Sequence, residues 1–327
     1  MNQRRKLLIA CGAGLAAAST HGLGQQRVFR VAYLSAQSVN SNSAIAFQTI
    51  KKRLSELGYA ERANIAFDSR WAEGDTSRLP ALAAELMALN PDVLMASATL
   101  AIRAAQQATG SIPIVMSPAT DPVGSGFVKS LARPGGNITG VANLYIDTSS
   151  KLIELLHSLA PKARRFGVLT MPRNPTHATQ LAEAMIAFKT LKLSGMPFSA
   201  TNGEEIDQAF AAMARQNIRA LVVMQEPLFL AQSQRIADLT VKYRLPAIFQ
   251  SSPNVEAGGL VSYGANLGVL NRMAAGYVDK LLKGTKPEDL PVEQPTRLEM
   301  VVNGKAAKAL GLKIPESILL RADRVIE

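Results

Sequence analysis

Short apolar stretches alternate with amphipathic segments along most of the chain, and this alternation constrains the fold more than any other feature of the sequence. Val28–Leu34 is the first apolar stretch, and the segment 44–57 that follows it carries Phe47, Ile50 and Leu54 at the spacing of one helix face. The same unit of strand, polar tip and helix then recurs. Sequential units with continuously apolar strands predict a parallel sheet covered by helices on both faces. We therefore expect an α/β fold.

The alternation occurs in two runs, which predicts two lobes. One run extends from Val28 to Val141 and the other begins at Phe166, and 327 residues are enough for two domains. The second run repeats the architecture of the first but not its sequence. We predict that lobe one comprises residues 28–143 and 251–286, and that lobe two comprises residues 144–250 and 291–327. The chain would then cross between the lobes near 142–145, 249–252 and 286–291.

The segment 112–141 shows how each unit presents polar groups. It opens with the apolar strand 112–116, leaves it through a polar crest at 117–122, and continues in the apolar-periodic segment 123–131, which we read as the start of a helix. The cluster 133–136 ends that segment, and a second strand follows at 137–141. In parallel α/β sheets the ligand crevice lies just outside the carboxyl ends of the strands. The crests of the successive units are therefore the candidate binding site.

Small hydroxyl, amide and aromatic side chains occupy these crests, and groups of this kind hold a small polar ligand through directed hydrogen bonds. The candidates are Ser35, Asn40, Ser97, Thr99, Ser117, Asn143, Tyr145, Asn174, Gln225, Gln250, Ser251 and Tyr263. Two acids join them, Asp121 and Glu226, which could receive the ammonium group of an amino acid. Each residue also has a purely structural interpretation, because strand tips are polar in any α/β protein. Asp121–Pro122 and Glu226–Pro227 in particular are common sequences for a turn or a helix start.

The first 24 residues have the organisation of a secretory signal peptide. Arg4, Arg5 and Lys6 precede an apolar stretch, 7–18, that is too short to span a bilayer, and small residues allow cleavage before Gln25. We therefore predict an exported, periplasmic protein. Cys11 has only four apolar residues before it, which disfavours a lipid anchor, and the paired arginines leave export by the twin-arginine route open.

Composition disfavours several other functions. The net charge is +11, but the basic residues are scattered among acids without interleaved aromatic residues, which argues against nucleic-acid binding. With one cysteine, in the signal segment, and three histidines without ligand spacing, we predict neither a metal site nor a cofactor. The sequence contains neither a G-x-S-x-G nucleophile elbow nor a P-loop motif. We therefore predict no catalytic residues.

Several long, ordered motifs resemble the TrpX-like family of ABC-transporter substrate-binding proteins. They lie at 70–75, 79–83, 121–126, 131–141, 302–311 and 314–323, so the resemblance extends over about 28–327. It implies a type I periplasmic-binding-protein fold, with two Rossmann-like lobes, crossing strands and a ligand cleft. It also implies delivery of the ligand to a membrane permease that a separate ATPase drives. Members that bind aromatic amino acids are known, but the shared motifs lie mostly in turns and do not identify this ligand.

We accordingly expect a monomeric solute-binding protein that captures a small polar molecule, an amino acid or a related compound, and passes it to an ABC permease. Two alternatives remain open at this point. One is a secreted α/β enzyme that uses Asp121 or Glu226 as a base, which requires a strongly shifted carboxylate pKa in the cleft. The other is a ligand-sensing domain that reports to a membrane receptor.

Overall fold

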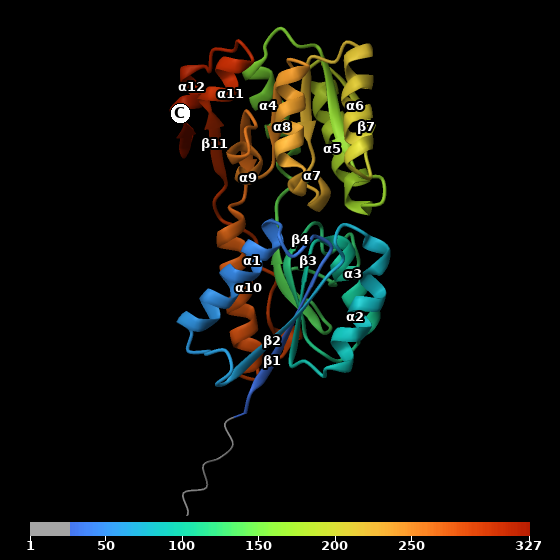
Figure 1. Ribbon diagram of the computed structural model, residues 1–327, viewed down its shortest axis with the longest axis vertical. Coiled ribbons are helices and arrows are strands. Elements are labelled where there is room, and N and C mark those ends of the chain that lie inside the picture. The colour runs from blue at the N-terminus through green and yellow to red at the C-terminus, as the bar shows by residue number, and fades with distance from the viewer. Residues whose placement is uncertain (1–26) are drawn as a thin grey trace, which may run out of the picture.

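The computed structural model describes residues 27–327. The predicted signal segment 1–24, which includes Cys11, therefore lies outside the described residues. The chain forms two α/β lobes that are stacked along the long axis of the molecule (Figure 1), so the predicted fold class is confirmed. Within residues 27–327, no helix combines the length and the apolar character that crossing a bilayer would require.

Lobe one is built on a five-stranded parallel sheet whose strand order is β2-β1-β3-β4-β5. Its strands are β1 (Phe29–Ser35), β2 (Ile65–Trp71), β3 (Val93–Ser97), β4 (Ile114–Ala119) and β5 (Ile138–Ala142). Its helices are α1 (Asn42–Glu56), α2 (Leu79–Ala88), α3 (Thr99–Ala108) and α10 (Leu267–Leu282), with a 3-10 turn η2 (Thr76–Arg78) before α2.

The sheet of lobe one is buried on both faces, as its apolar strands predict. Alternate strand residues point to opposite faces, so Leu34 of β1 packs with α2 and α3, whereas Tyr33 packs with α1 and α10. Helix α10 comes from a part of the chain more than 120 residues after β5, yet it packs against α1, β4 and β5. This long-range packing places the amino terminus of α10 beside the carboxyl ends of the strands.

Lobe two contains a seven-stranded sheet whose strand order is β12-β11-β10-β9-β8-β6-β7. Its strands are β6 (Arg165–Thr170), β7 (Ser194–Ser199), β8 (Ala220–Val223), β9 (Ala247–Phe249), β10 (Val261–Gly264), β11 (Glu299–Asn303) and β12 (Arg324–Ile326). Its helices are α4 (Ser149–Leu159), α5 (Pro175–Thr190), α6 (Gly203–Arg215), α7 (Pro227–Ala231), α8 (Ser233–Lys242), α9 (Ser252–Glu256), α11 (Gly304–Ala309) and α12 (Glu316–Leu319). Strands β10 and β11 pair antiparallel, whereas the other neighbouring strands pair in parallel.

The second lobe boundary that we predicted is wrong. Residues 251–264 were expected in lobe one, but β10 pairs with β9 and β11 and therefore belongs to the sheet of lobe two. The chain crosses after Gly264 and enters α10 at Leu267, three residues later. The third crossing is also later than expected, because the 3-10 turn η3 (Pro287–Asp289) and Val292 still pack on lobe one. The sequence could not show to which lobe β10 belongs, because an apolar run has the same pattern whichever sheet it joins.

The segment 123–131, which we expected to start a helix, is a series of turns. Asp121 and Gly126 have positive φ angles of 45° and 68°, which interrupt helical geometry. Phe127 and Val128 are nonetheless buried in the core between the sheet and helices α2 and α3. The apolar periodicity therefore reflected burial rather than helix formation.

Candidate functional site

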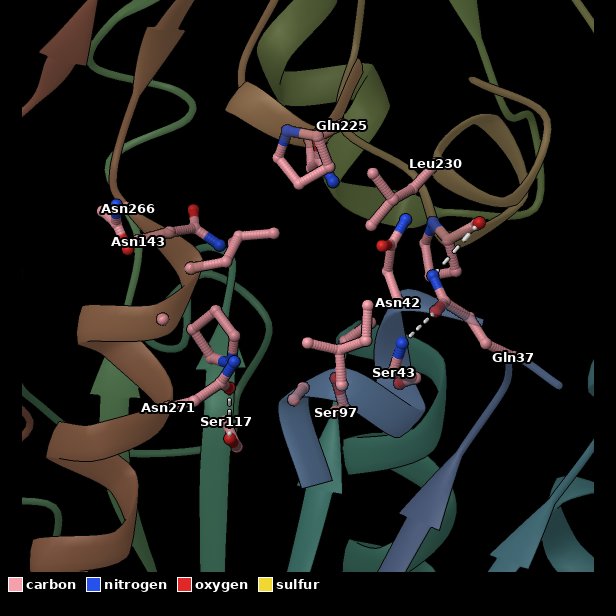
Figure 2. A pocket seen from close by; sticks show the side chains of 18 of the residues that line it. Gln37, Asn42, Ser43, Ser97, Ser117, Asn143, Gln225, Leu230, Asn266 and Asn271 are labelled. Carbon is pink, nitrogen blue, oxygen red and sulfur yellow. Dashed lines mark hydrogen bonds between the residues drawn. The ribbon is translucent and has the colours of Figure 1, made fainter. Parts of the chain in front are cut away.

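A cavity of about 300 Å³ lies between the two lobes (Figure 2). Its walls come from the carboxyl ends of the lobe-one strands and from the corresponding edge of lobe two. Seven of the predicted residues line it: Ser97, Thr99, Ser117, Asn143, Tyr145, Asn174 and Gln225. The strand tips that we predicted as the candidate site therefore border this cavity in both lobes. Whether these side chains contact a ligand remains a prediction.

Three helix amino termini form much of the lobe-one wall. They belong to α1 with Asn42, α3 with Thr99 and α10 with Gly268, all of which line the cavity. At α3 the residue before the helix, Ala98, has a φ of 68° and supplies no capping side chain. First-turn N–H groups and the helix dipole favour negative groups of a ligand. The lobe-one side is therefore suited to a carboxylate or another acceptor.

Gln37 connects the two walls. Its Oε1 accepts hydrogen bonds from the N–H of Ser43 (2.9 Å) and the hydroxyl of Ser41 (3.0 Å), which fixes the start of α1. Its Nε2 donates to the carbonyl of Pro227 in lobe two at 3.2 Å. Gln37 itself is buried. This contact holds the lobes together at the edge of the cavity.

A network of amides supports the lobe-two wall. Gln250 accepts a hydrogen bond from the N–H of Gln225 (2.9 Å) and donates to the carbonyl of Tyr145 (2.9 Å). The hydroxyl of Ser251 donates to the Oε1 of Gln225 at 2.9 Å. Gln250 and Ser251, both predicted as ligand contacts, are almost completely buried and do not line the cavity. They instead fix the orientation of Gln225, which does line it.

Tyr145 contributes an uncommitted polar group. Its ring is buried, and among the described residues its hydroxyl has no hydrogen-bond partner, although the residue lines the cavity. Burial raises the pKa of this hydroxyl well above its usual range, so it stays protonated. A neutral O–H at the wall can donate to a ligand and accept from one.

Four further predicted residues lie away from the cavity, each for a local reason. The hydroxyl of Ser35 is buried against that of Ser43 at 2.8 Å, and Asn40 is exposed on the surface. Tyr263 packs at the edge of the lobe-two core. Asp121 accepts a hydrogen bond from the N–H of Gly124 at 2.9 Å and so stabilises a turn, which is the structural alternative that its sequence context left open.

Glu226 also lies outside the lining, although both of its neighbours belong to it. Its backbone is extended (φ −145°, ψ 140°), so the side chains of Gln225 and Pro227 lie on one side of the chain and that of Glu226 on the other. The carboxylate is 3 % exposed and accepts a hydrogen bond from Asn174 at 2.8 Å. Burial raises its pKa to about 7.

Other lining residues were not among the predicted ones. Asn42 and Asn266 stand at the amino termini of α1 and α10, and Asn271 lies inside α10, where its Oδ1 pairs with the hydroxyl of Ser117 at 3.2 Å (Figure 2). Asn42 and Asn266 follow strand tips, which is a signal that sequence reasoning could have used. Asn271 is 154 residues from its partner, and no local pattern reveals that contact.

Within residues 27–327, no group of three or more histidine, cysteine, aspartate or glutamate side chains is arranged to hold a metal ion. Among the described residues that line the cavity, Glu256 alone carries a formal charge, and it pairs with Arg324. The cavity therefore offers directed hydrogen bonds, helix amino termini and apolar surface.

Two α/β lobes joined by three crossings, with a small polar cavity between them, define a cleft-type binding protein of the type I periplasmic architecture. Residues 35–326 match the family model described as ABC transporter substrate binding protein. The chain therefore belongs to that family.

Known relatives agree with this assignment. A tyrosine-binding protein from Clostridioides difficile (strain R20291) is 28% identical over 263 residues, which cover 80% of this chain and 75% of that protein. An ABC domain from Streptococcus pneumonia, solved in complex with L-Trp, is 27% identical with a TM-score of 0.84, covering 91% of this chain and 100% of that one. The ligand-free, open structure of a substrate binding protein with adhesive properties from Clostridium difficile is 25% identical with a TM-score of 0.66, covering 91% and 99%.

Proposed function

We propose that the protein is an exported substrate-binding protein that captures one aromatic amino acid in the interlobe cavity and delivers it to an ABC permease. The observation that carries this proposal is a cavity lined from both lobes mainly by neutral hydrogen-bonding groups, with its one charged lining residue, Glu256, among those the structure describes, paired with Arg324, in a chain of this family. Its volume of about 300 Å³ is at the small end of the range of small-molecule sites, roughly 300–1,000 Å³. Relatives that bind tyrosine and tryptophan support the ligand class.

The lining residues could contact the carboxylate, the ammonium group and the aromatic ring of such a ligand. The α-carboxylate would face the helix amino termini of lobe one, where Asn42 and Thr99 lie. The acceptors Gln225 and Ser252 would receive the ammonium group from the lobe-two side. Apolar surface from both lobes, supplied by Ile45, Pro118, Pro227, Leu230 and Leu267, would enclose the aromatic ring.

Binding would be coupled to closure of the lobes. The chain resembles the L-Trp complex more closely than the ligand-free, open structure, although the two relatives are almost equally distant in sequence. The hydrogen bond from Gln37 to the carbonyl of Pro227 joins the two lobes in the present arrangement. A ligand that touches both lobes would shift the population toward this arrangement, with motion at the three crossings.

The same proposal covers export and partners. The signal segment at residues 1–24 would send the protein to the periplasm, where it would act as a monomer and dock on the permease. A non-enzymatic role is supported by the position of the two carboxylates that an enzyme could have used. Asp121 stabilises a turn and Glu226 faces away from the cavity.

A thermal-shift screen tests the proposal. The purified protein, unfolded and refolded to remove any bound ligand, would be heated with amino acids, deaminated aromatic acids, short peptides, sugars and purines. A ligand at about a hundred times its Kd adds roughly 2.7 kcal/mol of stability, which raises the Tm visibly. We expect L-tyrosine, L-tryptophan or L-phenylalanine to give the largest shift and to be recovered unchanged. Stabilisation by sugars alone, or turnover of the ligand, would contradict the proposal.

A further inference from the structure

The lobe-two wall conceals a carboxylate that the proposed function does not use. Glu226 lies one side chain behind the cavity surface, because its Oε2 accepts a hydrogen bond from Nδ2 of Asn174, and Asn174 lines the cavity. The carboxylate is 3 % exposed. Burying a carboxylate without a cationic partner lowers the stability of the fold. A contribution of this carboxylate to ligand binding would offset that cost.

The neighbours of Glu226 are neutral. Nδ1 of His177 accepts a hydrogen bond from the N–H of Met171 at 2.8 Å, so this imidazole carries its proton on Nε2, which lies 3.2 Å from the carbonyl of Gln225 and 3.5 Å from Glu226. Burial lowers the pKa of His177 to about 4, so the ring is uncharged near neutral pH. In the part of the chain that the structure describes, no cationic side chain pairs with Glu226.

The two walls of the cavity therefore differ in electrostatic character. On the lobe-one side, the amino termini of α1, α3 and α10 present partial positive charge. On the lobe-two side, the carboxylate of Glu256 at the lining is paired with Arg324, and the uncompensated carboxylate of Glu226 stands behind Asn174 and Gln225 in a region from which water is excluded. The interaction of charges across such a region is screened much less than in water. This polarity matches a ligand with a carboxylate at one end and an ammonium group at the other.

We propose that Glu226 is a specificity-determining positioning residue that selects ligands with a primary ammonium group through the field of its buried charge, without touching them. The inference rests on the proposed function and adds the basis on which amino acids are distinguished from aromatic acids that lack the amine. Bound ammonium favours the ionised form of Glu226, so binding releases a proton where Glu226 is protonated in the free protein. Affinity for an amino acid therefore rises as the pH increases through about 7.

The Glu226→Gln variant isolates the charge. Glutamine retains an oxygen that can accept the hydrogen bond from Asn174, and its volume is almost the same. Glu183→Gln is the matched control, because it removes one carboxylate from the exposed face of α5, the helix that also carries His177. Circular dichroism and thermal unfolding of both variants verify that they fold.

Titration calorimetry would compare L-tyrosine and L-tryptophan with 3-(4-hydroxyphenyl)propionate and indole-3-propionate, which lack the amine, between pH 5.5 and 8. For the wild type and Glu183→Gln we expect affinity for the amino acids to rise about tenfold over this range, as a Coulomb interaction across a partly dry wall implies. Glu226→Gln should bind the amino acids about tenfold more weakly at pH 8, without pH dependence, and should bind the deaminated acids no more weakly than the wild type.

Two results would overturn the inference. If Glu226→Gln keeps the affinity and pH dependence of the wild type for amino acids, the charge of Glu226 has no role in binding. If it loses affinity equally for amino acids and deaminated acids, Glu226 merely supports the wall. Failure of the proposed function is recognised separately, because the wild type itself would then bind neither aromatic amino acid at any pH, and the inference would fall with it.

Discussion

Gln37→Glu changes the hydrogen bond that joins the two lobes while it preserves the local structure of lobe one. The introduced carboxylate can still accept from the N–H of Ser43 and the hydroxyl of Ser41, so the start of α1 keeps its cap. On the other side, the Nε2 that donates to the carbonyl of Pro227 at 3.2 Å becomes an oxygen. Two acceptors then face each other when the lobes are closed.

The expected cost falls on the closed state alone. Losing the hydrogen bond removes about 1 kcal/mol, and leaving the Pro227 carbonyl without its donor beside a charge costs about 1–2 kcal/mol more. Since each 1.4 kcal/mol is about tenfold in affinity, the sum of about 2–3 kcal/mol should weaken ligand binding by roughly 30- to 140-fold. The Tm of the ligand-free protein should hardly change, because neither core is altered.

Titration calorimetry with the ligand from the screen measures this effect. Gln106→Glu is the control, because Nε2 of Gln106 also donates to a backbone carbonyl, that of Gly126 at 2.9 Å, but within lobe one. We expect the control to bind like the wild type. If Gln37→Glu binds with wild-type affinity, closure through this contact is not part of binding and the reasoning is refuted.

Three further changes test other parts of the structure. Tyr145→Phe should leave the free energy of unfolding unchanged, because the hydroxyl has no partner among the described residues, but should weaken ligand binding about 3- to 10-fold in calorimetry; equal binding would remove the hydroxyl from the site. Gly264→Ala should lower the free energy of unfolding, measured in urea, by about 1–3 kcal/mol, because the new Cβ would lie 2.0 Å from the carbonyl oxygen of Gln250. The control Gly276→Ala in α10 places its Cβ where no other atom lies within 4 Å, so it should be neutral or slightly stabilising. Similar effects of the two substitutions would contradict the close approach at Gly264. Glu226→Gln should stabilise the ligand-free protein at pH 8 by up to about 3 kcal/mol. The pKa of Glu226 is about 7 in the folded state against an ordinary value of 4.5, so its ionisation destabilises the fold above pH 7 and has no effect below pH 4.5. Urea unfolding should therefore show no gain in stability at pH 4.5, and an equal gain at both pH values would show that the charge is not responsible.

The sheets could be predicted because burial on both faces leaves a direct record in the sequence. The apolar run at the start of lobe one became β1, and its alternate residues pack against different pairs of helices. The assignment of β10 to a lobe could not be predicted in the same way. Its antiparallel pairing with β11 joins residues about 40 positions apart, and nothing local distinguishes it from a strand of lobe one.

The candidate site was predictable in position but not in the direction of its side chains. Strand tips lie at one edge of a parallel sheet, so Ser97, Ser117 and Gln225 could be expected there. Ser35 and Glu226 occupy equivalent tips, but their side chains point into the lobes, where Ser43 and Asn174 accept or donate hydrogen bonds. Successive side chains of an extended segment point in opposite directions, so a shift by one residue exchanges the side chains that face the cavity with those that face the lobe interior. The sequence does not show which of these two arrangements the fold adopts.

Equilibrium binding of an aromatic amino acid to the purified wild type, followed by recovery of the ligand, tests the central claim most directly. Titration calorimetry should give one L-tyrosine or L-tryptophan per chain, and mass spectrometry should recover the same compound after the protein is denatured. A chain that binds no amino acid, or that returns a chemically altered product, would contradict the claim that this cavity captures and releases an intact amino acid.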